Sequence, residues 1–155
     1  MKNIILFLFI TINVFSKSIE TKNNFKDIIQ PQPTIAEVYY NRLEVSTRLP
    51  YFTNRFIDRK ANERPDVPVT VWQTIKDNLD YTSFKISAIQ VLNNNFTSTQ
   101  MQQTITKYQD KPYIPILTLK LREELQLAGL EFDIVVLNQI NNILVANGHQ
   151  PIQNQ

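Results

Sequence analysis

Residues 117–151, LTLKLREELQLAGLEFDIVVLNQINNILVANGHQP, carry the longest apolar pattern in the chain and decide its fold. The apolar side chains recur every three or four residues, which is the spacing of one face of an α-helix. They are Leu117, Leu121, Leu125, Ala128, Phe132, Val135, Val136, Ile140, Ile143 and Leu144. Gly129, as a residue just past a helix end, could end one helix and start another. Because the apolar pattern keeps its phase through Gly129, we favour one long helix with a weak point at that glycine. Gly148, followed by Pro151, should end it.

Three earlier segments begin with a capping box, in which a threonine is followed three residues later by Glu or Gln. The pairs are Thr34 with Glu37, Thr70 with Gln73, and Thr97 with Gln100. In each pair the threonine oxygen can accept a hydrogen bond from a backbone amide of the first turn, and the longer side chain can reach back. Each pair precedes apolar residues at helical spacing, so the three pairs predict three helix starts.

The other helix boundaries come from proline, aspartate and asparagine. The first helix should run from Thr34 to Leu49, because Pro50 lacks a backbone donor and should kink or break it. Asp80 can cap another helix, which NNN at 93–95 should end. We find no alternating strand pattern of useful length. The predicted fold is an all-α small bundle of about five or six helices with a long C-terminal helix.

The N-terminus MKNIILFLFITINVFSKS has the order of a secretory signal peptide: one lysine, an apolar run, and the pair Val14 and Ser16 before a cleavage point. The run is shorter than the roughly 20 residues that span a membrane. An N-terminal anchor or a buried helix is the alternative. We therefore divide the chain into a signal peptide (1–16), a flexible polar leader (17–33), a helical domain (34–148) and a polar tail (149–155). Export would place the protein in the periplasm or outside the cell.

Composition argues against several function classes. The formal net charge is +2 and charged residues make up 19% of the chain, which is too balanced to favour nucleic-acid binding. Two glycines leave no room for a Gly-rich phosphate loop, and there is no cysteine for a disulfide, a thiol nucleophile or a metal site. His149 is the single histidine and is expected in the exposed tail. No catalytic, cofactor or metal constellation is visible, so we expect no cofactor.

The stretch FTSTQMQQTITKYQDKP, residues 96–112, indicates a helix, a stop and a second helix. A helix-turn-helix that binds DNA would need basic side chains on this segment, and Lys107 is the single basic residue in residues 98–109. We interpret it as a junction between packed helices. The same stretch resembles the helical hairpin of the domain-of-unknown-function 2059 family (DUF2059), which comprises small, exported, mainly bacterial, all-helical proteins. The matching positions are Phe96, Thr97, Gln100, Met101, Ile105 and Tyr108.

AGLEF at 128–132 and ANGHQP at 146–151 look like later landmarks of this family, so the resemblance covers roughly residues 70–151. Lys107 and His149 stand where the family usually has aromatic residues, and DKPYIP lacks the glycine of its Pro-x-Gly turn. The resemblance implies an all-helical fold and export. The family has no settled biochemical activity, and the resemblance therefore implies no catalytic residue. Asn95-Phe96-Thr97 also matches the N-glycosylation pattern, which matters only in a eukaryote.

The first helical region is rich in aromatic residues, which are candidates for a binding surface. They are Tyr39, Tyr40, Tyr51, Phe52 and Phe56. Packing of some of them against Trp72 and Phe84 is the alternative. Two adjacent tyrosines on one helix should not both face one core, so one of them is expected to be exposed. An exposed aromatic groove would bind a partner protein or an apolar ligand.

Charged residues give weaker candidates. The stretch RFIDRKANER, residues 55–64, could dock to an anionic lipid or polysaccharide, although a helix end that favours cations explains it as well. Carboxylate pairs could perform acid–base chemistry, but neighbouring positions on a helix point to different sides. The neighbouring pairs are Glu123 with Glu124 and Glu131 with Asp133. Glu37 and Glu44 share a helix face seven residues apart, and a polar stripe is the alternative interpretation of that pair.

The sequence favours an exported helical protein that is not an enzyme and binds a partner protein or an apolar ligand. The alternative is a small envelope enzyme, or an enzyme accessory, whose carboxylates meet only in the fold. A homodimer through the long C-terminal helix is a third alternative. No membrane span and no nucleic-acid partner are expected.

Overall fold

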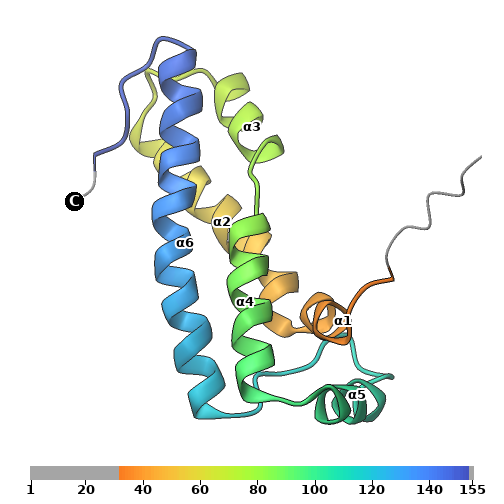
Figure 1. The fold of residues 1–155 in the computed structure, drawn as a ribbon. Helices are drawn as coiled ribbons and strands as arrows, with labels where there is room; N and C mark the ends of the chain where they lie inside the picture. Colours follow the sequence, from red (N-terminus) through yellow and green to blue (C-terminus); the bar gives the residue numbers. More distant parts are fainter. Residues whose placement is uncertain (1–31, 154–155) are drawn as a thin grey trace, which may run out of the picture. The chain divides into compact units, whose positions relative to one another are not determined.

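The computed structural model describes residues 32–153, which contain six helices (Figure 1). They are α1 (Ile35–Arg42), α2 (Glu44–Glu63), α3 (Val69–Asp77), α4 (Thr82–Asn95), α5 (Ser98–Lys107) and α6 (Leu119–Ala146). Within this range there is no strand, only an isolated bridge between Leu43 and Ile114. The predicted all-α bundle with a long C-terminal helix is confirmed. The predicted signal peptide, and the predicted leader up to residue 31, lie outside the described residues.

Helix α6 is the long helix that the opening pattern predicts, and it runs without a break through Gly129. One apolar face is buried along its whole length: Leu121, Leu125, Ala128, Phe132, Val136, Ile140 and Leu144. The helix ends as predicted at Gly148, whose φ is +80°. The amide of Gly148 donates to the Val145 carbonyl (3.0 Å), and the amide of His149 donates to that of Leu144 (2.9 Å). This is the Schellman motif, in which glycine tolerates the left-handed conformation.

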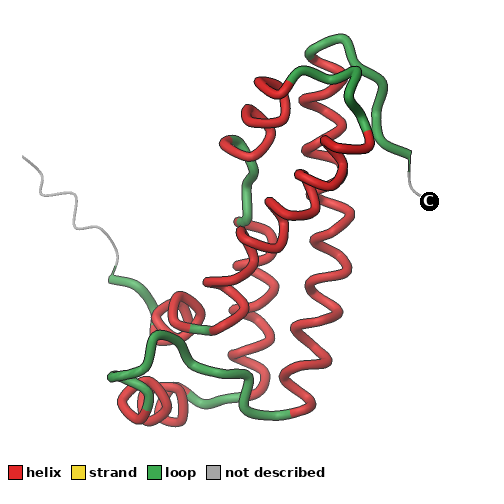
Figure 2. Tube along the Cα trace, turned by 180° about the vertical axis from the view of Figure 1, so that it is seen from behind, coloured by secondary structure: helices red, strands yellow, loops and turns green. Residues whose placement is uncertain are grey.

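The core lies where α4 and α6 run side by side, as Figures 1 and 2 show. The ring of Phe132 on α6 lies 5.7 Å from those of Tyr81 and Phe84 at the start of α4. Helix α3 packs against α6 and α2, while α1 packs against α2, α4 and α5. One aromatic cluster therefore links the long helix α6 to the start of α4.

The first helical region is divided at Leu43, and not at Pro50 as predicted. Leu43 is fully buried in an extended conformation, and the amide of Ile114 donates to the Arg42 carbonyl (2.6 Å). The amide of Glu44 in turn donates to the Ile114 carbonyl (2.9 Å). These bonds to a distant segment replace the helical bonds at this point. Helix α2 continues through Pro50, which is exposed and removes one backbone bond only.

The junction at residues 96–112 is held by Arg42, a residue that the sequence analysis did not single out. Its guanidinium donates to the carbonyls of Ile105 (3.3 Å), Tyr108, Gln109 (3.2 Å) and Lys111 (3.1 Å). The last carbonyls of a helix lack partners within the helix and attract positive charge. Arg42 on α1 therefore caps the end of α5, and this stretch is a junction between packed helices, as predicted.

Two of the three predicted capping boxes are confirmed and one is wrong. At Thr34 the hydroxyl accepts from the Glu37 amide (3.2 Å), and the Glu37 carboxylate accepts from the Thr34 amide (2.9 Å). Thr97 forms the same reciprocal pair with Gln100. Thr70, in contrast, lies inside the first turn of α3, because the turn already closes on the Pro68 carbonyl.

Two further helix starts use side-chain oxygens. Asp80 accepts the amide of Thr82, the first residue of α4, at 2.8 Å, and the bonds to Thr82 lower the pKa of this carboxyl. Thr118 accepts the amide of Leu121 (3.1 Å) and caps α6. The cap at Thr118 was not predicted, because Leu121, rather than Glu or Gln, stands three residues later and the capping-box pattern is absent.

The two threonines give a matched test of these assignments. Thr97→Ala should lower the free energy of unfolding by about 1 kcal/mol, because it leaves an amide at the start of α5 without its acceptor. Thr70→Ala should change it by less than about 0.5 kcal/mol, since Thr70 is exposed and caps nothing. Urea denaturation of both variants measures the difference. Equal losses would show that α3 also begins with a capping box.

The segment predicted to be a polar tail lies back against the bundle as far as Ile152. The Asn141 side chain accepts from the Ile152 amide (2.7 Å) and donates to the Ile152 carbonyl (3.0 Å). Arg64 donates to the Gln150 carbonyl (3.2 Å), and His149 is half-buried rather than exposed. The reversal after Gly148 and these long-range bonds explain the difference.

Candidate functional site

The five aromatic residues predicted as a candidate surface divide into two groups. Tyr39 and Tyr40 are both buried, so the expectation that one of them is exposed is wrong. The Tyr39 ring stacks on Phe96 at 5.8 Å, and the Tyr40 ring lies 6.4 Å from Phe84. Because α1 has helices on several sides, two adjacent positions about 100° apart both meet protein. Burial, as the largest cause, raises the pKa of Tyr39 to about 12.

The other three aromatic residues lie on α2 and are accessible to solvent. Tyr51 is 58% exposed and Phe52 is 56% exposed, while Phe56 is half-buried. The rings of Tyr51 and Phe52 meet edge to face at 5.5 Å. Of the five, Phe52 and Phe56 line a concave surface.

That surface is a groove between α2 and α6, which we call the α2–α6 groove. It consists of two adjoining hollows that share Leu49 and Asp133. The first, of about 330 Å³, is lined by Val45, Leu49, Phe84, Ile116, Arg122, Leu125, Gln126, Gly129, Leu130 and Asp133. The second, of about 540 Å³, is lined by Leu49, Phe52, Thr53, Phe56, Arg59, Asp133, Ile134, Val136 and Leu137.

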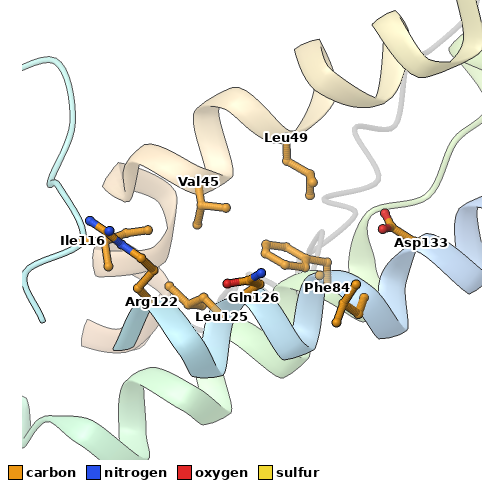
Figure 3. A pocket seen from close by; sticks show the side chains of 10 residues that line it. Val45, Leu49, Phe84, Ile116, Arg122, Leu125, Gln126 and Asp133 are labelled. Carbon is orange, nitrogen blue, oxygen red and sulfur yellow. The ribbon is translucent and has the colours of Figure 1, made fainter. Parts of the chain in front are cut away.

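The groove follows from how the two helices pack. Helix α2 packs mainly against α1 and α3, and α6 packs against α4 and α3. Val45 and Leu49 point from α2 toward α6, with the Phe84 ring between the two helices (Figure 3). Gly129 leaves this wall open, because a Cβ built there would have no neighbouring atom within 4 Å. The glycine interpreted from sequence as a weak point in the helix therefore also shapes the groove.

Charge is unevenly distributed in the groove. Asp133 is the only carboxylate among the described residues that line the two hollows, and it belongs to both. Partial burial beside apolar walls raises the pKa of the Asp133 carboxyl, so the charged form is disfavoured there. Arg122 lines the first hollow, at the end opposite Asp133 in Figure 3, and Arg59 lines the second. The middle of the groove is therefore a poor place for a second negative charge.

The predicted carboxylate pairs are engaged elsewhere or separated. Glu131 lines a hollow beside α4, whereas Asp133 lines the α2–α6 groove. Glu124 accepts from Asn95 and pairs with Lys120 (3.6 Å). Glu37 pairs with Lys85 (3.3 Å), and Glu44 pairs with Arg48 (2.9 Å). Within residues 32–153 no three His, Asp or Glu residues lie close enough together to hold a metal ion.

The basic stretch at 55–64 also divides into two groups. Lys60 pairs with Glu63 (2.7 Å) and Arg64 pairs with Asp66 (2.8 Å). Arg55 and Arg59 have no carboxylate partner among the described residues. Instead, their guanidinium groups lie over the rings of Tyr51 (5.8 Å) and Phe56 (5.5 Å).

Asn95, the residue of the N-glycosylation pattern, is half-buried at the end of α4. Its side-chain amide donates to the Val91 carbonyl (2.8 Å) and to the Glu124 carboxylate. The nitrogen that would carry a glycan is therefore occupied in the folded protein.

None of the helices in residues 32–153 combines the length and the apolar character that crossing a membrane requires. Comparison of the chain with protein-family models, with curated proteins and with solved structures finds no match. The resemblance of residues 70–151 to the DUF2059 family therefore stays a prediction.

Proposed function

We propose that this protein is an exported, non-enzymatic binding module that holds an elongated apolar ligand in the α2–α6 groove. The observation that carries the proposal is the groove itself. Its walls are mostly apolar, with few polar side chains, and its hollows measure about 330 and 540 Å³. Ligand sites in proteins typically have this composition and volumes of about 300–1,000 Å³.

The free energy for binding would come from apolar side chains that now face solvent. Phe52, Leu130 and Ile134 line the groove and are 56%, 57% and 61% exposed. Removing apolar surface from water stabilises a complex by about 25 cal/mol per Å². Clustered exposed apolar side chains of this kind often mark an interaction site. A ligand between the two walls would pack against α2 and α6, which do not pack closely against each other along the groove.

Export rests on the N-terminal pattern and on the resemblance to the DUF2059 family. The signal peptide (1–16) would direct the chain to the periplasm or the exterior. In either place a groove of this kind would capture apolar molecules outside the cytoplasm.

A homodimer through α6 is the second candidate, and one observation favours it. Leu127, Leu130 and Ile134 recur at helical spacing on the exposed side of α6 and are each more than half exposed. In a two-fold dimer, the same residues of both copies would cover one another.

Binding of a neutral fluorescent probe, N-phenyl-1-naphthylamine, to the full protein tests the first candidate. Gly129→Phe fills the first hollow and Ile134→Glu places a charge in the second. Each should weaken binding at least about tenfold, a change of about 1.4 kcal/mol. Gly129→Ala is the matched control. It should keep binding and raise the free energy of unfolding by about 0.5–1 kcal/mol, because alanine favours the helix and meets no neighbour.

Equal binding by the wild type and all three variants, or no binding by the wild type, would contradict the proposal. Native mass spectrometry over a range of concentrations separates the second candidate. A dimer that Ile134→Glu dissociates and Gly129→Phe leaves intact would favour the α6 interface. A monomer at all concentrations would exclude it.

A further inference from the structure

A pair of arginines lies at one end of the α2–α6 groove. Arg55 and Arg59 are one turn apart on α2 and, with Phe52 and Phe56, line a third hollow of about 310 Å³. Phe52, Phe56 and Arg59 also line the 540 Å³ hollow. The basic hollow therefore shares three side chains with the apolar groove, and both arginines are exposed.

The placement of these two arginines is unfavourable by itself. Like charges four residues apart on a helix repel each other. The neighbouring cations Lys60 and Arg64 each pair with a carboxylate, whereas Arg55 and Arg59 have none within the described part of the chain. Their contacts with the rings of Tyr51 and Phe56 hold them without neutralising them. An anion bound between them would relieve the repulsion.

Asp133 sets the direction in which such a ligand would lie. Its carboxyl occupies the middle of the groove, where a second negative charge is disfavoured. An anionic group would therefore lie away from Asp133. The Arg55–Arg59 end offers two guanidinium groups, whereas the hollow on the other side of Asp133 offers the single guanidinium of Arg122, so the anion is expected at the Arg55–Arg59 end with an apolar chain along Phe52, Phe56 and Leu49. Guanidinium groups suit this role because they bind carboxylates with two parallel hydrogen bonds.

We infer that the ligand of the α2–α6 groove is a single-chain amphiphile with a carboxylate head group, held between Arg55 and Arg59. This inference rests on the proposed function and adds the chemical class of the ligand. It also assigns a function to Arg55 and Arg59 of the basic stretch at 55–64. The preference of a helix end for cations explains this stretch only in part.

Displacement of N-phenyl-1-naphthylamine by two amphiphiles of equal chain length, dodecanoate and dodecanol, tests the inference. Dodecanoate should bind about tenfold more tightly than dodecanol, because only the carboxylate makes charge-assisted bonds to the arginines. The double variant Arg55→Gln/Arg59→Gln should abolish this preference, because it weakens dodecanoate binding by a larger factor than dodecanol binding. Arg122→Gln, which removes the arginine of the other hollow, is the matched control and should keep the preference.

Equal affinity of the wild type for the two amphiphiles would overturn the inference and leave the proposed function intact. No displacement by either, together with no binding of the fluorescent probe, would reject the proposed function itself. Phosphatidylglycerol vesicles form a third arm. In one outcome, the protein binds these vesicles only when Arg55 and Arg59 are present and shows no preference for free dodecanoate. That result would mean that the arginines bind an anionic membrane surface, and it would also overturn the inference.

Discussion

Arg42→Met should lower the free energy of unfolding by about 2–4 kcal/mol, although Arg42 is neither in the core nor in the groove. Its guanidinium donates to four carbonyls at the end of α5 and in the turn after it. Methionine keeps most of the side-chain length but donates nothing, so the half-buried carbonyls of Ile105 and Tyr108 and the exposed carbonyls of Gln109 and Lys111 lose this donor. Leaving buried polar groups unpaired costs more than the net value of the bonds themselves.

Chemical denaturation measures the loss, and hydrogen exchange locates it. Exchange should quicken first in α5 and at residues 108–114, where the chain also bonds to Arg42 and Glu44 through Ile114. Arg48→Met is the matched control. Arg48 pairs with Glu44 (2.9 Å) on an exposed surface, and the loss should be below about 1 kcal/mol. If the two methionine variants were equally stable, Arg42 would not hold the junction.

Phe132→Ala should lower the free energy of unfolding by about 3–5 kcal/mol, the largest effect that we expect from a single substitution. Phe132 is 3% exposed, and its ring lies 5.7 Å from those of Tyr81 and Phe84. The substitution removes buried apolar surface and leaves a cavity between α4 and α6. Since small domains are stable by about 5–15 kcal/mol, a substantial part of the total would be lost.

Thermal and urea unfolding followed by circular dichroism measure this effect. Phe52→Ala is the control, because Phe52 is 56% exposed and its ring contributes little to the core. It should leave stability nearly unchanged and weaken probe binding in the groove. A Phe132→Ala variant as stable as Phe52→Ala would mean that the aromatic cluster does not hold α4 on α6.

Local sequence patterns determined most of the helices. The apolar period of residues 117–151 predicted α6 through Gly129 and its end at Gly148, and capping boxes predicted the starts of α1 and α5. These features could be read because a helix forms hydrogen bonds between residues three or four apart. The residues that determine such a helix and its ends therefore lie within a few positions of one another in the sequence.

The predictions that were wrong depend on contacts between residues that are far apart in the sequence. Leu43 ends α1 because its neighbours bond to Ile114, and Tyr39 and Tyr40 are both buried because α1 has helices on several sides. Arg42 caps carbonyls 63 to 69 residues away in sequence. No local pattern carries such contacts, so the helix boundary at Leu43, the burial of both tyrosines and the capping role of Arg42 could not be predicted.

The candidate site, the α2–α6 groove, could be predicted from the sequence in part. The sequence by itself indicated that α2 is rich in aromatic residues, that Arg55 and Arg59 are close together, and that Gly129 interrupts no apolar phase. Only the tertiary structure decided that Phe52 and Phe56 face α6 across a groove and that Asp133 lies within it. The physical reason is that helical period determines which residues share a face, whereas the packing of other helices determines which faces remain open.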